Sequence, residues 1–224
     1  MGRDNHPQVR QQRQLERKRA NRAGYDRILI VCEGKKTEPQ YLSEIQQDQR
    51  LHTANVHIIH SQLGTSPLRV VECAEEILLH GSSHQRIRPR AFEQVFAVFD
   101  RDDHPCYGTA LQKAAALHGK YRNDVKEKVA FRAVVSVPCF ELWLLIHYET
   151  IAHPIHRDEV LRRLKRHIPD YEKGKGGYFA LTRSRLSEAI RRAEELGVRH
   201  KAHDGRAPYT DLGTLIQLMT NMKP

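Results

Sequence analysis

The chain lacks the long apolar runs and nucleotide-binding motifs that define several large protein classes. Its longest apolar runs are far shorter than a membrane-spanning helix, and its Arg- and Gln-rich beginning lacks the apolar stretch of a signal peptide. The P-loop, GxSxG and GxGxxG motifs are all absent, which argues against ATP hydrolysis and serine hydrolysis by this chain. We therefore expect a cytoplasmic protein that has no membrane partner.

Cysteine is scarce, and its four copies are scattered along the chain as Cys32, Cys73, Cys106 and Cys139. No CxxC pair occurs, and two of the cysteines lie inside apolar segments, where a buried free thiol is the usual state. This usage predicts a reducing, intracellular location. The fourteen histidines include pairs spaced three apart but no set with zinc-site spacing, so we interpret them as surface histidines of a basic protein.

Positive charge is abundant and unevenly placed. A formal charge of +10 and a pI near 9.6 favour an anionic partner, with nucleic acid as the first candidate. Residues 1–27 hold eight basic and three acidic residues, which gives +5, half of the net charge. The segment from Arg10 to Arg22 has almost no apolar residues, so it predicts a solvated basic arm. The arm either binds phosphates, through Arg13, Arg17, Lys18 and Arg19, or is a solubilising extension.

The remaining chain alternates between strand-like and helix-like patterns up to about residue 156. Apolar runs predict strands at 28–32, 56–59, 95–99 and 129–137, and helical spacing predicts helices at about 37–48, 67–80, 109–123 and 140–146. This order indicates an α/β fold with a mainly parallel, Rossmann-like sheet flanked by helices. After residue 157 only helices are expected, at 157–168, 184–197 and 211–221. We therefore divide the chain into a basic arm (1–27), an α/β core (28–156) and a helical C-terminal extension (157–224).

Two of the predicted strands end abruptly in carboxylates. Glu33 follows the first strand, and Asp100 and Asp102 follow the third. In an open α/β sheet, ligands collect at the carboxyl ends of the strands, so these acids are expected to converge. Carboxylates held together repel one another unless they are protonated or share a cation, and oxygen ligands suit Mg²⁺ or Mn²⁺. The pattern predicts a metal-dependent phosphoryl-transfer centre, although a single Asp at a strand end can also cap a turn.

Other charged residues near these segments have two interpretations each. Glu38 begins the next helix, where it can bind metal or simply complement the helix dipole. Glu141 lies in an apolar helix and needs either the metal centre or an arginine as partner. Lys173 and Lys175 belong to a Gly-rich stretch that either stabilises charge on a phosphate or is an exposed basic loop. The same alternatives apply to the two lysines that follow Glu33, Lys35 and Lys36.

Four segments in order resemble the RloB-like family: ILIVCEGKKTEPQYL, VFAVFDRDD, VPCFELWLLIHY and APYTDL. The resemblance covers roughly residues 15–220. It implies a Toprim-type nuclease from bacterial restriction or abortive-infection loci, a form of antiviral defence, usually encoded beside an AAA-type ATPase. The Toprim pattern of a Glu after the first strand and Asp-x-Asp after the third maps onto Glu33, Asp100 and Asp102. OLD-type nucleases place a second metal-binding Glu at the position of Glu38.

Taken together, the residues and the resemblance lead to a Mg²⁺-dependent (or Mn²⁺-dependent) nuclease as the first hypothesis. Its metal ligands would be Glu33, Glu38, Asp100 and Asp102, its catalytic residues Glu33, Glu141 and Lys173, and its further nucleic-acid contacts Lys35, Lys36 and Lys175. The substrate would be DNA or RNA, and the partner an AAA-type ATPase. One alternative is a non-catalytic nucleic-acid-binding subunit, and another is a regulatory subunit that docks on the ATPase through residues after about 157. A homo-oligomer is compatible with each hypothesis.

Overall fold

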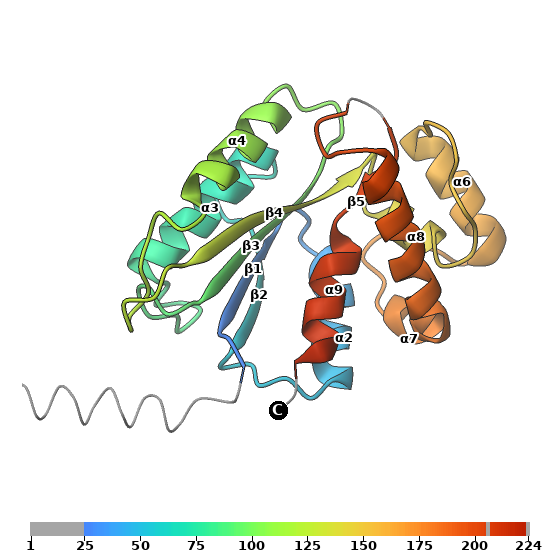
Figure 1. Ribbon diagram of the computed structural model, residues 1–224. Helices are drawn as coiled ribbons and strands as arrows, with labels where there is room; N and C mark the ends of the chain where they lie inside the picture. Colours follow the sequence, from blue (N-terminus) through green and yellow to red (C-terminus); the bar gives the residue numbers. More distant parts are fainter. Residues whose placement is uncertain (1–24, 205–206, 223–224) are drawn as a thin grey trace, which may run out of the picture.

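A five-stranded sheet forms the centre of the molecule, with helices on both faces (Figure 1). The computed structural model describes residues 25–204 and 207–222. The strand order is β2-β1-β3-β4-β5. The first four strands run parallel, and β5 runs antiparallel to β4. The strands are β1 (Ile28–Cys32), β2 (Val56–His60), β3 (Gln94–Asp100), β4 (Ala130–Val137) and β5 (Tyr209–Thr210). The expected α/β class is confirmed, with a sheet that is mixed rather than purely parallel.

The central strands are apolar throughout because both of their faces are covered. All five residues of β1 are fully buried. Leu29 and Val31 point into one core and Ile28, Ile30 and Cys32 into the other, as the alternation of side chains along a strand requires. A continuous apolar run of strand length is typical of such a doubly covered parallel strand.

The helices form one layer on one face of the sheet and a deeper layer on the other (Figure 1). The first layer consists of α3 (Pro67–His80) and α4 (Tyr107–Leu117). On the other face lie α2 (Thr37–Asp48) and α9 (Leu212–Asn221), with the short buried helix α5 (Glu141–Leu145). Beyond them, the second layer is built by α6 (Arg157–His167), α7 (Tyr178–Thr182), a 3-10 turn (Arg183–Arg185) and α8 (Leu186–Arg199).

Two expectations about the elements are wrong. The C-terminal part is not only helical, because β5 pairs with the end of β4, where the Ser136 and Thr210 hydroxyls lie 3.0 Å apart. The helix expected to reach residue 123 ends at Leu117, and Gly119 follows it with a φ of 70°, a conformation that glycine adopts without steric cost. The division into arm, core and extension stays a prediction.

The described chain begins at the amino ends of the strands. There Arg27 pairs with Glu93 at 2.8 Å and also with Asp124. The arm residues Arg13, Arg17, Lys18 and Arg19 lie outside the described residues, so their expected role stays a prediction. Within the described ranges, no helix combines the length and apolar character needed to cross a bilayer.

Candidate metal centre at the carboxyl edge of the sheet

The carboxyl ends of β1 and β3 bring Glu33 and Asp100 together. The strands are in register with Cys32 beside Val98, and the Glu33 backbone N–H donates to the Val98 carbonyl at 2.9 Å. The backbone N–H of Asp100 in turn donates to Glu33 Oε2 at 2.9 Å. The Glu33 side chain therefore lies across the end of β3.

Three more carboxylates join them from other parts of the chain. Asp102 follows β3, Glu38 lies in the first turn of α2, and Glu141 is the first residue of α5. Their charges act on one another: Glu38 and Glu141 both raise the pKa of Asp100, whose burial raises it most. We call these five residues the acidic cluster: Glu33, Glu38, Asp100, Asp102 and Glu141.

Gly34 is the residue that lets Glu38 reach this cluster. A Cβ atom at position 34 would lie 2.1 Å from Glu38 Oε2, closer than any real contact. The glycine after Glu33 is therefore explained by the carboxylate that folds back over it. Thr37 is the first residue of α2, and its hydroxyl oxygen accepts a bond from Gly174 N–H at 3.1 Å.

Two cations from the C-terminal helical part reach the acidic cluster. Arg157, the first residue of α6, places Nη1 2.9 Å from Asp102 Oδ1. Lys173 places Nζ 3.0 Å from Glu141 Oε1, and the Tyr171 hydroxyl donates to the same oxygen at 2.9 Å. Five carboxylates thus face two fixed cations, so an excess of negative charge is left if all the acids are ionised.

The pKa values reflect this excess. Burial raises the pKa of Glu33 to about 7, and the nearby charges of Asp102 and Glu38 add to the shift. Burial also raises the pKa of Glu38, again with a contribution from neighbouring acids. At Glu141 burial acts in the same direction, but the contact with Lys173 outweighs it and the pKa is lowered. Without a bound cation, part of the acidic cluster therefore holds protons near neutral pH.

One group of three side chains has the spacing of a metal site. Ligand atoms of Glu33, Asp102 and His104 all lie within 4.8 Å of one another, and His104 Nε2 is 3.7 Å from Glu33 Oε1. In addition, Glu141 Oε2 is buried and has no hydrogen-bond partner among the described residues. Carboxylate oxygens suit Mg²⁺ or Mn²⁺, and the imidazole nitrogen favours the softer of the two, Mn²⁺. The donor set therefore fits a divalent cation.

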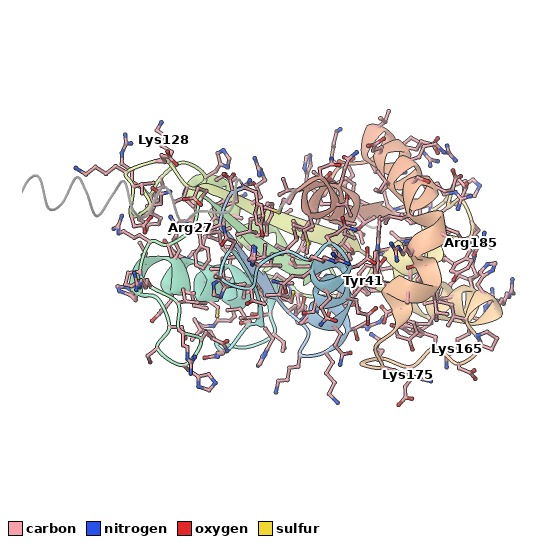
Figure 2. The ribbon with its side chains drawn as sticks, turned by 90° about the horizontal axis from the view of Figure 1, so that it is seen from below. Arg27, Tyr41, Lys128, Lys165, Lys175 and Arg185 are labelled. Carbon is pink, nitrogen blue, oxygen red and sulfur yellow. The ribbon has the colours of Figure 1, made fainter. Side chains whose placement is uncertain are left out.

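The other lysines proposed from the sequence lie around this centre. Lys35 and Lys36 are exposed at the start of α2, and the Lys36 side chain packs on Gly174. Lys175 is exposed in the loop between α6 and α7, on the side of the molecule that also carries Lys165 (Figure 2). That loop is tied to α2, because the Glu44 carboxylate accepts bonds from the N–H groups of Gly177 and Phe179 at 2.5 and 2.9 Å.

Sequence reasoning missed three residues at the site. His104 stands two positions after Asp102, so its place in the same loop was the local signal that it could lie beside the acids. Arg157 and Tyr171 come from distant parts of the chain and gave no local signal. They enter the site only because the C-terminal helices pack against the carboxyl edge of the sheet.

Comparison with known proteins identifies the family. A family model described as RloB-like protein matches residues 28–219, a span that includes the whole acidic cluster. The chain therefore belongs to the RloB-like protein family. No curated protein and no solved structure matches the sequence of this chain.

Proposed function

We propose that this protein is a metal-dependent nuclease of the Toprim type, which hydrolyses phosphodiester bonds with Mg²⁺ or Mn²⁺. The observation that carries the proposal is the acidic cluster, in which five buried or half-buried carboxylates face two lysine or arginine side chains, Arg157 and Lys173, among the residues that the structure describes. The sequence order of Glu33 after β1, Asp100 at the end of β3 and Asp102 two residues later agrees with the Toprim pattern of acids and supports the proposal. A site of this charge favours a divalent cation over further protons at neutral pH.

The residues suited to hold the cation are Glu33, Asp102 and His104, with Glu38 and Asp100 behind them. A divalent cation there supplies an activated water and stabilises the leaving oxygen of a phosphodiester. The pKa of Glu33 is about 7 without a cation, and a bound cation would lower it, which keeps the carboxylate ionised and able to accept a proton from water. Glu33 is therefore the first candidate for the general base.

Lys173 and Arg157 are placed to meet the substrate. Their side chains are 51% and 39% exposed, yet both reach carboxylates of the acidic cluster. A phosphate that approaches the cluster would meet these two cations first, which offsets repulsion by the acids. Glu141 holds Lys173 in position through a 3.0 Å ion pair and is a positioning residue in this account.

The distribution of charge supports nucleic acid as the substrate. Residues 157–224 hold fifteen basic and nine acidic residues, which gives +6, whereas residues 28–156 hold fourteen and fifteen, which gives −1. The acidic cluster is therefore flanked by a positive helical part that can attract a polyanion. From the family resemblance we also propose a role in bacterial restriction or abortive infection together with an AAA-type ATPase.

The proposal is tested by incubating the purified protein with plasmid DNA, linear DNA and RNA, with Mg²⁺ or Mn²⁺, in the presence and absence of the ATPase. We expect cleavage that EDTA and Glu33→Gln abolish. Glu72→Gln, which removes a carboxylate on the surface of α3, is the matched control and should cleave normally. If no substrate is cut in a Glu33-dependent way, even with the ATPase present, the nuclease proposal is wrong.

A non-catalytic nucleic-acid-binding subunit is the second candidate. The ion pairs Arg157–Asp102 and Lys173–Glu141 favour it, because they already satisfy two acids without any metal. In that case Asp100→Asn combined with Asp102→Asn should leave nucleic-acid binding unchanged, and the wild type should not cleave. Cleavage by the wild type that the double variant loses would exclude this candidate.

A further inference from the structure

The opposite edge of the sheet carries a second charged surface. At the amino ends of the strands, the loop before β3 and the loop before β4 expose six basic residues. We call them the amino-edge surface: Arg86, Arg88, Arg90, Arg122, Lys126 and Lys128. Figure 2 shows Lys128 at the opposite end of the molecule from Lys165 and Lys175.

The two loops hold each other in a defined arrangement. Arg90 Nη1 donates to the Arg122 carbonyl at 3.1 Å, and the Asp124 N–H donates to the Arg90 carbonyl at 2.7 Å. Arg122 also donates to the Lys126 carbonyl at 2.7 Å. The basic side chains of the amino-edge surface therefore project from a fixed scaffold.

These charges are not neutralised locally. In the part of the chain that the structure describes, no ion pair joins any of the six to an acidic side chain, whereas Arg27 beside them pairs with both Glu93 and Asp124. Six cations without acidic partners repel one another, and a polyanion relieves that repulsion.

Three of the six residues have a backbone conformation that is unusual for them. Arg86 and Arg90 have a φ of 54° and Lys126 a φ of 67°, where glycine or asparagine would be less strained. The turns closed by the Ser82–Ile87 and Arg122–Lys128 bridges hold Arg86 and Lys126, and residues in such conformations are enriched at functional sites. The presence of long basic side chains at these positions supports a binding role.

A groove runs beside this surface and is lined by two of its arginines. Arg86 and Arg88 line it together with Asn55 and His57, and its volume of about 620 Å³ is within the range of ligand sites. Arg86 and Arg88 therefore present guanidinium donors at the groove that match phosphate oxygens.

The basic arm is attached at the same edge. The described chain starts at Tyr25, whose hydroxyl oxygen accepts the His52 N–H at 2.8 Å, close to the first residues of the groove. The preceding residues 1–24 hold seven basic and two acidic residues in sequence. Tyr25, to which these residues are joined in sequence, therefore lies at the amino edge of the sheet.

We propose that the amino-edge surface binds the phosphate backbone of nucleic acid and anchors it at a distance from the acidic cluster. The seven residues of β3 separate the two edges by about 20 Å. The inference relies on the proposed function for the identity of its ligand, DNA or RNA, but binding at this edge requires neither metal nor cleavage. An acidic protein surface is the competing partner, and the test separates the two.

The test compares two double variants of equal charge. Arg86→Gln with Arg88→Gln removes two charges from the amino-edge surface. Arg69→Gln with Arg191→Gln removes two exposed charges from α3 and α8 and is the matched control. Binding of fluorescent duplex DNA and of RNA is measured in EDTA over a salt series, and melting temperatures establish that both variants fold.

We expect the slope of log affinity against log salt to decrease by about two for the amino-edge variant with duplex DNA, and to stay unchanged for the control. Which of the two ligands shows the larger effect identifies the preferred nucleic acid. If the amino-edge variant binds both ligands as the wild type does, the inference is overturned and the surface serves another partner.

That result leaves the nuclease proposal intact, because cleavage is measured separately with Mn²⁺. Conversely, altered binding without any cleavage by the wild type would uphold the inference while the nuclease proposal fails.

Discussion

At the scale of single residues, the acidic cluster works against the stability of the protein when no cation is bound. Asp100 is half-buried at the end of β3, and its pKa is raised well above its usual value by burial and by the charges of Glu38 and Glu141. A buried carboxylate of this kind costs free energy in its ionised form unless a positive charge lies nearby. Such an arrangement is expected where function, and not folding, determines the residue type.

The pKa of Glu33 leads to a prediction about stability and pH. Its folded-state pKa of about 7 lies above the ordinary value of 4.5, so its contribution to stability is fully present below about pH 4.5 and is lost as the pH rises through 7. In EDTA, the unfolding free energy of the wild type should therefore fall relative to that of Glu33→Gln between pH 5 and pH 8, by about 2–3 kcal/mol. Urea unfolding at both pH values measures the difference. If the unfolding free energies of the two proteins depend equally on pH, then the pKa of Glu33 is not raised in the folded state.

Gly34 leads to a second prediction, since a Cβ there would collide with the Glu38 carboxylate. Gly34→Ala should displace Glu38 and weaken Mn²⁺ binding, while the unfolding free energy changes by only about 1 kcal/mol, because the displaced group is a flexible side chain. A double-mutant cycle with Glu38→Ala supplies the control. In the Glu38→Ala background, the alanine at position 34 should have no further effect on Mn²⁺ affinity. If Gly34→Ala lowers the Mn²⁺ affinity equally in the wild type and in Glu38→Ala, then the glycine is not explained by its contact with Glu38.

Glu141 leads to a third prediction, because one of its oxygens pairs with Lys173 and the other is buried without a hydrogen-bond partner among the described residues. Glu141→Gln keeps the shape but loses the charge that holds Lys173, so we expect a folded protein with strongly reduced cleavage. The pKa of Lys173 is raised mainly by this partner, against the effect of burial, and should fall in the variant. If Glu141→Gln keeps full cleavage activity, then the charge of Glu141 is not needed for cleavage and the residue has only a local structural role.

At the scale of elements, the site depends on how the loop between α6 and α7 docks onto α2. Glu44 on α2 accepts the N–H groups of Gly177 and Phe179, and Thr37 accepts that of Gly174. These contacts place Lys173 and Tyr171 of the same loop over Glu141. The position of Lys173 is therefore determined by a helix that contributes only Glu38 to the acidic cluster.

This docking gives a fourth prediction. Glu44→Ala removes the acceptor of two backbone N–H groups and should loosen residues 173–177, with a loss of about 1–3 kcal/mol in unfolding free energy. Hydrogen exchange at Gly177 and Phe179 should become faster, and cleavage should decrease. Glu76→Ala on the exposed side of α3 is the control and should change neither quantity. Unaltered exchange in Glu44→Ala would show that the loop is held by other contacts.

The elements also show what the sequence could predict and why. Long apolar runs such as β1 and β3 were found, together with the acids at their ends, because burial of both faces leaves a continuous signal. The strand β5 has two residues, too few for any periodicity, so it was missed. Arg157 and Tyr171 were missed because contacts between distant segments leave no local pattern. The acids and Lys173 could thus be predicted, whereas Arg157 and the Tyr171 hydroxyl, which contact two of the acids, could not.

At the scale of the whole molecule, the two edges of the sheet have opposite character. The carboxyl edge gathers the acidic cluster with two cations from the helical part, and the amino edge presents six basic side chains beside the attachment point of the arm. A nucleic acid bound at the amino edge could extend about 20 Å along the sheet to the acidic cluster. Because of this separation, Arg86→Gln with Arg88→Gln should change binding without a direct effect on the acidic cluster. Glu33→Gln should change cleavage without a direct effect on the amino-edge surface.

The central claim is that the acidic cluster binds a divalent cation, and calorimetric titration with Mn²⁺ tests it most directly. The wild type should bind Mn²⁺ with an affinity that increases as the pH rises through 7, because the cation displaces the proton that Glu33 holds. Asp100→Asn combined with Asp102→Asn should abolish the binding while the apo protein stays folded and as stable as the wild type or more so. If the wild type takes up no Mn²⁺ at millimolar concentration and the double variant is merely destabilised, the acids are structural and the account is contradicted.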